Sequence, residues 1–129
     1  MAALERFATW SAPGLYLSSV VAAELRAGVH GSASRKSLEK DVLGPFVRRG
    51  RVLTPSAAAW DALGLTLAML RQDEGLQLAR VSRAFALDTL LAYSCREAGA
   101  VLVTRNERDM ARIRRAFVFD YVAPYPEQP

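Results

Sequence analysis

The chain has 129 residues, of which 51% are hydrophobic and 23% charged, and it carries a net charge of +4. This length and composition suit one compact domain over residues 1–129, and no apolar run reaches the ~18 residues of a transmembrane helix. The only cysteine, Cys95, excludes an internal disulfide framework and favours a reducing, cytoplasmic location.

Short apolar runs and helical patterns alternate in the first half of the chain. A strand is expected at residues 15–17, and Ser18 or Ser19 is suited to cap a helix over residues 20–28. A polar, glycine-containing loop is expected at residues 30–34. Another very short strand is expected at residues 52–53.

Residues 35–49 have a helical pattern with apolar side chains at a period of four, namely Leu38, Val42 and Phe46. The Gly44-Pro45 pair should break or kink this helix. A long helix then begins near Ser56 and ends near Gly75. Its apolar face predicts core packing or a dimer face, formed by Trp60, Leu63, Leu67 and Leu70.

The last third of the chain predicts a helix, a strand, a second helix and a second strand. The first helix begins near Leu87 and ends at Gly99, and Cys95 lies on its apolar stripe. A continuous apolar run at residues 100–103 is typical of a buried parallel strand. The final strand is expected at residues 118–122, before a loose Pro-rich tail. Alternating strands and helices indicate an α/β fold with a parallel sheet.

Carboxylate and amide side chains cluster around the strand at residues 100–103. Asp88 opens the helix before this strand, and Asn106 and Asp109 follow the strand. Polar groups at the mouth of such a helix–strand–helix unit lie where α/β proteins place ligands. With Glu24 from upstream they would form a carboxylate cluster, which requires a neutralising cation or protons. Hard cations such as Mg²⁺ prefer oxygen ligands of this kind.

Each of these side chains also has a simpler structural explanation. Glu24 could lie at the edge of an apolar stripe and pair with an arginine. Asp88, in a first helical turn, would be favoured by the helix dipole. Asn106 is a good N-cap with Asp109 at the third helical position. Capping and metal binding are compatible, because both place oxygens at a helix start.

Arginine provides 15 of the 17 basic residues. Several arginines follow the strand at residues 100–103, and Arg105, Arg108 and Arg112 are suited to contact phosphates. A solvated cationic face would explain the same residues. The composition of a GC-rich genome would explain the excess of arginine over lysine.

Two segments resemble one known family. Y-L-S-S-V-V-A-A-E-L-R-A-G, at 16–28, resembles the segment around the second acid of PIN domains, particularly those of VapC-type toxins. A-L-D-T-L-L-A-Y-S-C-R-E-A-G-A-V-L-V-T-R-N-E-R-D, at 86–109, resembles the third acid and the T-R-N-x-x-D segment of the same family. The two motifs occur in the right order, and the resemblance covers roughly residues 15–123.

The resemblance implies a PIN-like (Rossmann-like) parallel sheet flanked by helices, and a Mg²⁺- or Mn²⁺-dependent ribonuclease toxin of a type II toxin–antitoxin system. Glu24 and Asp88 match the second and third acids and would bind metal with Asp109. Asn106 would complete the shell or orient a water molecule. The implied partners are an RNA substrate, for which Arg105, Arg108 and Arg112 are the candidate contacts, a cognate antitoxin, and a second copy of the chain.

One departure from the family pattern separates two functional hypotheses. PIN domains begin with a central strand that ends in an Asp, whereas no Asp precedes Asp41 in this chain. The first strand and first acid are therefore expected to be missing. A ribonuclease whose first acid is supplied upstream is one hypothesis, and an inactive PIN-like module that binds a protein or RNA is the other. A third, an unrelated α/β protein whose acids are only helix caps, predicts that Glu24 and Asp88 lie far apart.

Overall fold

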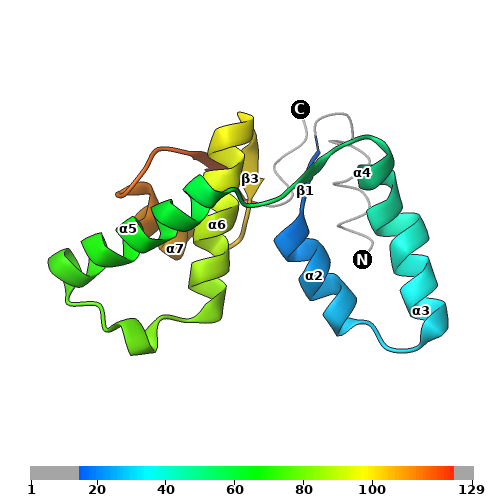
Figure 1. The fold of residues 1–129 in the computed structure, drawn as a ribbon, viewed down its shortest axis with the longest axis horizontal. Helices are drawn as coiled ribbons and strands as arrows, with labels where there is room; N and C mark the ends of the chain where they lie inside the picture. Colours follow the sequence, from blue (N-terminus) through cyan, green and yellow to red (C-terminus); the bar gives the residue numbers. More distant parts are fainter. Residues whose placement is uncertain (1–14, 124–129) are drawn as a thin grey trace. The chain divides into compact units, whose positions relative to one another are not determined.

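The structure is a computed structural model that describes residues 15–123, arranged in two compact units (Figure 1). The division falls between Thr54 and Pro55. We refer to residues 15–54 as the N-terminal unit and to residues 55–123 as the C-terminal unit, and each is described by itself. That residues 1–129 form a single domain stays a prediction. The expectation of a missing first strand and the expectation of a loose tail concern segments outside the described residues.

The N-terminal unit begins with a strand that leads directly into a helix. Strand β1 spans Leu17–Ser18 and helix α2 spans Ser19–Gly28, close to the predicted bounds. Of the two predicted capping serines, Ser18 is the cap, since its hydroxyl accepts a hydrogen bond of 3.1 Å from the Val20 amide. Strand β2, Val52–Leu53, pairs in parallel with β1.

A second helical run packs beside α2 and consists of three consecutive segments (Figure 1). They are α3 (Ser32–Ser37), the π-helical turn η2 (Leu38–Leu43) and α4 (Gly44–Arg48). The run begins inside the stretch expected to be a loop. The period-four side chains Leu38, Val42 and Phe46 all contribute to the apolar core of this unit, together with Leu17, Val21, Ala22, Val29 and Leu43.

No break occurs at Gly44-Pro45, because α4 follows η2 without interruption, and the kink that was the alternative expectation stays a prediction. The π-turn lies immediately before Pro45, and the Gly44 amide donates to the Glu39 carbonyl, five residues back. Pro45 therefore sits in the first turn of α4, a position that suits its fixed φ. The wider π-turn is the local change by which the helical run accommodates its proline.

The C-terminal unit begins with the long helix α5, Ala57–Glu74. Ser56 caps its start by accepting from the Ala59 amide, and Gly75 ends it in the left-handed conformation with φ 68°. Both bounds agree with the prediction. A single 3-10 turn, η3 (Leu78–Arg80), follows in the connection to the next helix.

Helix α6 spans Arg83–Ala98 and begins earlier than predicted. Its N-cap is Ser82, whose hydroxyl accepts a 3.0 Å hydrogen bond from the Phe85 amide. Asp88 is the sixth residue of the helix, so the prediction that it occupies the first turn is wrong. The helix dipole acts mainly within the first turn and therefore does not account for this acid. Gly99 ends the helix as predicted, with φ 66°.

Strand β3 (Val101–Val103), helix α7 (Glu107–Arg114) and strand β4 (Asp120–Val122) complete the unit. Strands β3 and β4 pair in parallel, with Val101 opposite Asp120. The predicted parallel α/β arrangement is confirmed, although the strands of residues 15–123 form two separate pairs. The prediction of a fully buried strand at residues 100–103 is wrong, because Val101 is 51% exposed.

The larger core lies in the C-terminal unit, between α5, α6, α7 and β4. Its fully buried members include Leu70, Met110 and Ile113, and Cys95 is buried as predicted. Trp60 is 58% exposed, which excludes it from the core, and its place in a dimer face stays a prediction. Among the described helices, none is long and apolar enough to cross a membrane.

Candidate functional site

Three of the predicted site residues meet in the C-terminal unit. The side-chain amide nitrogen of Asn106, Nδ2, lies 3.2 Å from Asp88 Oδ2 and 2.8 Å from Asp109 Oδ2. One amide group thus donates to both carboxylates. All three side chains are partly buried, which strengthens their electrostatic interactions relative to those of fully exposed groups.

The local structure positions each of these side chains. Asn106 is the N-cap of α7, as predicted, and its Oδ1 accepts from the Asp109 amide. Thr104 Oγ1 accepts from the Asn106 amide at 3.1 Å, which fixes the turn between β3 and α7. Because Oδ1 is engaged by the cap, Nδ2 faces the two acids. Helix α6, packed against α7, brings Asp88 to the same point.

The arrangement suits a divalent cation. The partial positive charge of the Asn106 amide lies between two carboxylates that would otherwise repel each other. Mg²⁺ is commonly held by one or two carboxylates, with waters and substrate phosphates as the other ligands. Asp88 and Asp109 fit that pattern. Within residues 15–123, however, no group of three or more His, Cys, Asp or Glu side chains is placed to hold an ion.

Arg112 supports the position of Asp109, a role that sequence reasoning missed. Its guanidinium lies 3.7 Å from Asp109 Oδ1 and 3.2 Å from Glu74 Oε1, and it stacks over the Phe85 ring at 5.0 Å. The i, i+3 spacing of Asp109 and Arg112 was the available signal. Glu74, at the end of α5, also binds Arg115. Arg112 thereby connects α5, α6 and α7 beside Asp88 and Asp109, which we call the acid pair.

Glu24 lies on α2 in the N-terminal unit and is exposed. It is therefore not a carboxylate buried in an apolar stripe, and neighbouring Leu25 is itself 39% exposed. The nearby arginine, Arg26, forms its ion pair with Glu39 at 2.9 Å. That Glu24 joins Asp88 at a metal ion stays a prediction.

The three arginines predicted to contact RNA differ in their surroundings. Arg105 and Arg108 are exposed, whereas Arg112 is partly buried and engaged by Glu74 and Asp109. Their contact with RNA stays a prediction. The contacts of Arg112 favour a structural role for its side chain.

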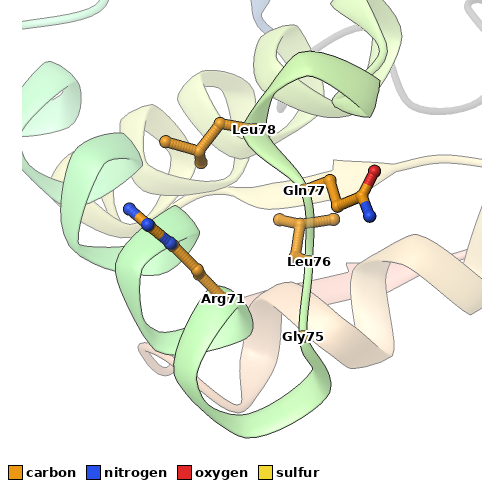
Figure 2. Close-up of a pocket in the computed structure, with 5 residues that line it drawn as sticks. All are labelled: Arg71, Gly75, Leu76, Gln77 and Leu78. Carbon is orange, nitrogen blue, oxygen red and sulfur yellow. The ribbon is translucent and has the colours of Figure 1, made fainter.

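Two hollows of the C-terminal unit lie apart from Asp88 and Asp109. One, of about 430 Å³, is formed where α5 ends and the chain turns toward η3. Figure 2 shows the Arg71 side chain on α5 and the Leu78 side chain on the connecting segment at this pocket. A larger groove of about 670 Å³ runs between α5, α6 and the turn at residues 116–118. Neither is lined by Asp88, Asn106 or Asp109.

Comparison with known proteins identifies the fold. No protein-family model and no curated protein matches this chain. A chain in the solved "Structure of FitAB bound to IR36 DNA fragment" is similar over 91% of this chain and 78% of its own length, with 17% identity and a TM-score of 0.65. The likeness confirms the predicted fold class, and the chain has a PIN-like α/β fold.

Proposed function

We propose that the chain is the toxin of a type II toxin–antitoxin system and that it cleaves RNA with Mg²⁺ or Mn²⁺. The observation that carries this proposal is the convergence of Asp88 and Asp109 on the Asn106 amide, at 3.2 and 2.8 Å. The likeness to FitAB, a toxin–antitoxin complex, supports the toxin assignment. The two sequence segments that resemble PIN domains, at 16–28 and 86–109, support the assignment of metal-dependent RNA cleavage.

The residues of the chain have separate roles in this proposal. Asp88 and Asp109 hold the cation, Glu24 is the third carboxylate, and Asn106 holds the acids in place or orients a water molecule. When bound, a divalent cation lowers the pKa of a coordinated water and stabilises charge on the attacked phosphate. Arg112 keeps Asp109 in position through their ion pair.

The proposed partners follow the same assignment. They are RNA as the substrate, a cognate antitoxin as the inhibitor and a second copy of the chain in a homodimer, all in the cytoplasm. The solved FitAB complex is bound to a DNA fragment. In the proposed system, DNA would be contacted by the antitoxin and not by the nuclease chain.

A second candidate function is an inactive PIN-like module that binds a protein or RNA. The observation that favours it is the lack of any three-residue ligand cluster within residues 15–123. The chain also has no Asp before Asp41, where the family places its first acid. Asp41 itself lies in the π-turn, where its carboxylate accepts a hydrogen bond from Ser37.

Metal titration and RNA cleavage together test the proposal. We expect calorimetry to show Mg²⁺ or Mn²⁺ binding by the wild-type chain that Asp88→Asn removes. RNA cleavage by Asp88→Asn should fall by at least about 100-fold. The matched control is Asp61→Asn, which removes an exposed carboxylate from α5. Normal cleavage by Asp88→Asn would exclude Asp88 from the site, and RNA binding without metal binding would favour the inactive module.

A further inference from the structure

The net charge of the chain resides in its N-terminal part. Residues 1–54 contain eight Lys or Arg and four Asp or Glu, whereas residues 55–129 contain nine of each. The difference of four in the first part equals the net charge of +4 of the whole chain. A concentration of positive charge in one part of a protein is the usual electrostatic signature of a polyanion-binding surface.

Three of these basic side chains form a row along the second helical run of the N-terminal unit. We call Lys36, Lys40 and Arg48 the basic row; they occupy positions i, i+4 and i+12, and Gly44 fills i+8. The row is offset by two residues from the apolar row of Leu38, Val42 and Phe46. Two residues correspond to about 200° around a helix, so the two rows lie on opposite faces. All three basic side chains are exposed.

The π-turn η2 keeps the basic row aligned. In a regular α-helix, a row with a period of four drifts by about 40° per step, because each turn has only 3.6 residues. The larger number of residues per turn in η2 reduces that drift between Lys40 and Gly44. At Gly44 a Cβ atom would lie 2.9 Å from Arg48 Nη1, so the Arg48 side chain folds back over the glycine toward the rest of the row.

The basic row is not paired with the acids of its own helical run. Within residues 15–123, none of its three members forms an ion pair. Of the two acids of η2, Glu39 forms an ion pair with Arg26, and Asp41 accepts a hydrogen bond from the neutral Ser37 hydroxyl. In the C-terminal unit, by contrast, Arg112 and Arg115 both bind Glu74.

We propose that the basic row is a surface that holds the phosphate backbone of single-stranded RNA. The row extends for about 18 Å, at 1.5 Å per residue over twelve residues. A protein partner fits less well, because the centre of a protein interface is apolar and the basic row contains no apolar side chain. The choice of RNA as the ligand rests on the proposed function.

Binding without cleavage tests this surface separately from the proposed chemistry. Fluorescence anisotropy of a labelled single-stranded oligouridine is measured in EDTA at several salt concentrations. The variant Lys36→Gln/Lys40→Gln/Arg48→Gln is compared with a control that removes the same charge from exposed positions of the C-terminal unit, Arg71→Gln/Arg80→Gln/Arg83→Gln. Circular dichroism confirms that both variants remain helical.

We expect the row variant to bind the RNA at least about tenfold more weakly at low salt. The magnitude of its slope of log K against log salt should fall by about 2, because each of the three lost phosphate contacts contributes ~0.7. The control should keep the wild-type slope. Equal changes in the two variants would overturn the proposal, since net charge alone would then explain binding. Unchanged RNA binding, with loss of binding to an acidic oligoglutamate peptide, would overturn it in favour of a protein partner. A chain that binds RNA through the row but never cleaves it would refute only the nuclease assignment.

Discussion

The two units differ in the balance of their charged side chains. In the C-terminal unit acids and bases are nearly equal in number and several are paired, as in the contacts of Arg112 with Glu74 and Asp109. In the N-terminal unit the basic side chains outnumber the acids, and the basic row faces solvent without ion pairs. Paired charges hold side chains in fixed positions, whereas unpaired charges attract a mobile polyanion. Under the two proposals above, chemistry and substrate capture would lie in different units.

The largest expected effect on stability comes from truncating one buried leucine in the core of each unit. Leu70 of the C-terminal unit is 0% exposed and Leu43 of the N-terminal unit is 1% exposed. We expect Leu70→Ala and Leu43→Ala each to lower the free energy of unfolding by about 3 kcal/mol, from lost burial and the residual cavity. Denaturant unfolding followed by circular dichroism measures both losses.

The same pair of variants tests whether the chain is one domain. If residues 1–129 form a single cooperative domain, both variants shift one common transition. Two transitions, each shifted by only one variant, would show that the units unfold independently and would refute the single-domain prediction. A loss below about 1 kcal/mol at either site would contradict the burial of that leucine.

The next largest effect on stability is expected from replacing one glycine in each unit by alanine. At Gly44 a Cβ atom would lie 2.8 Å from the Glu39 carbonyl oxygen, whereas at Gly64, within α5, a Cβ atom would meet nothing within 4 Å. We expect Gly44→Ala to destabilise the chain by about 2 kcal/mol through this overlap. Gly64→Ala should stabilise it by up to about 1 kcal/mol through helix propensity. Thermal unfolding of both variants measures the difference, and stabilisation by both would refute the tight π-turn.

The contrast at Gly44 shows where sequence reasoning was sufficient and where it was not. Capping serines and terminal glycines are local signals, so both ends of α5 and the end of α6 could be predicted. The continuity through Gly44-Pro45 could not, because it depends on a π-turn stabilised by the packing of Leu38 and Leu43 in the core. The start of α6 was missed because Ser82 precedes residues with no clear apolar period.

The candidate site shows the same limit. Asn106 as an N-cap and its proximity to Asp109 follow from three-residue spacing. The sequence also placed Asp88 and Asp109 in one group, and both contact the Asn106 amide. The contact of Arg112 with Glu74 joins residues 38 positions apart and could not be deduced from local spacing. An exposed Glu24 at the edge of its stripe was one of the open alternatives, and periodicity could not decide between them, since it defines a face of the helix but not what covers that face.

Alkaline pH should affect the C-terminal unit through Cys95. Burial raises the pKa of its thiol from the ordinary 9.0 to about 11. The stability associated with the neutral thiol is fully present below pH 9 and is lost as the pH rises toward and through 11. Allowing for solvent screening, the loss at pH 11 should be about 1.5 kcal/mol relative to Cys95→Ala, whose unfolding free energy lacks this dependence. Chemical denaturation at pH 8 and pH 11 compares the two; parallel pH profiles would contradict the burial of the thiol.

The smallest expected effect concerns the acid pair itself. Asn106→Asp preserves the N-cap, because Asp and Asn cap equally well. It replaces the NH₂ group that bridges Asp88 and Asp109 with an oxygen of a third carboxylate. Without divalent cations we expect a loss of about 1 kcal/mol from the lost hydrogen bonds and the added repulsion. Millimolar Mg²⁺ should restore the melting temperature, since a cation would take over the neutralising role of the amide.

The matched control is Asn106→Ser, which keeps a capping oxygen and removes the bridge without adding a charge. It should lose stability to a similar extent and should respond to Mg²⁺ less than Asn106→Asp does. Melting curves of both variants with and without Mg²⁺ therefore separate the capping role of Asn106 from its role between Asp88 and Asp109. If neither variant responds to Mg²⁺ more than wild type, the acid pair of the C-terminal unit does not by itself attract a cation. The carboxylate of Glu24, in the N-terminal unit, would then be the next to test, because a third acid would be required.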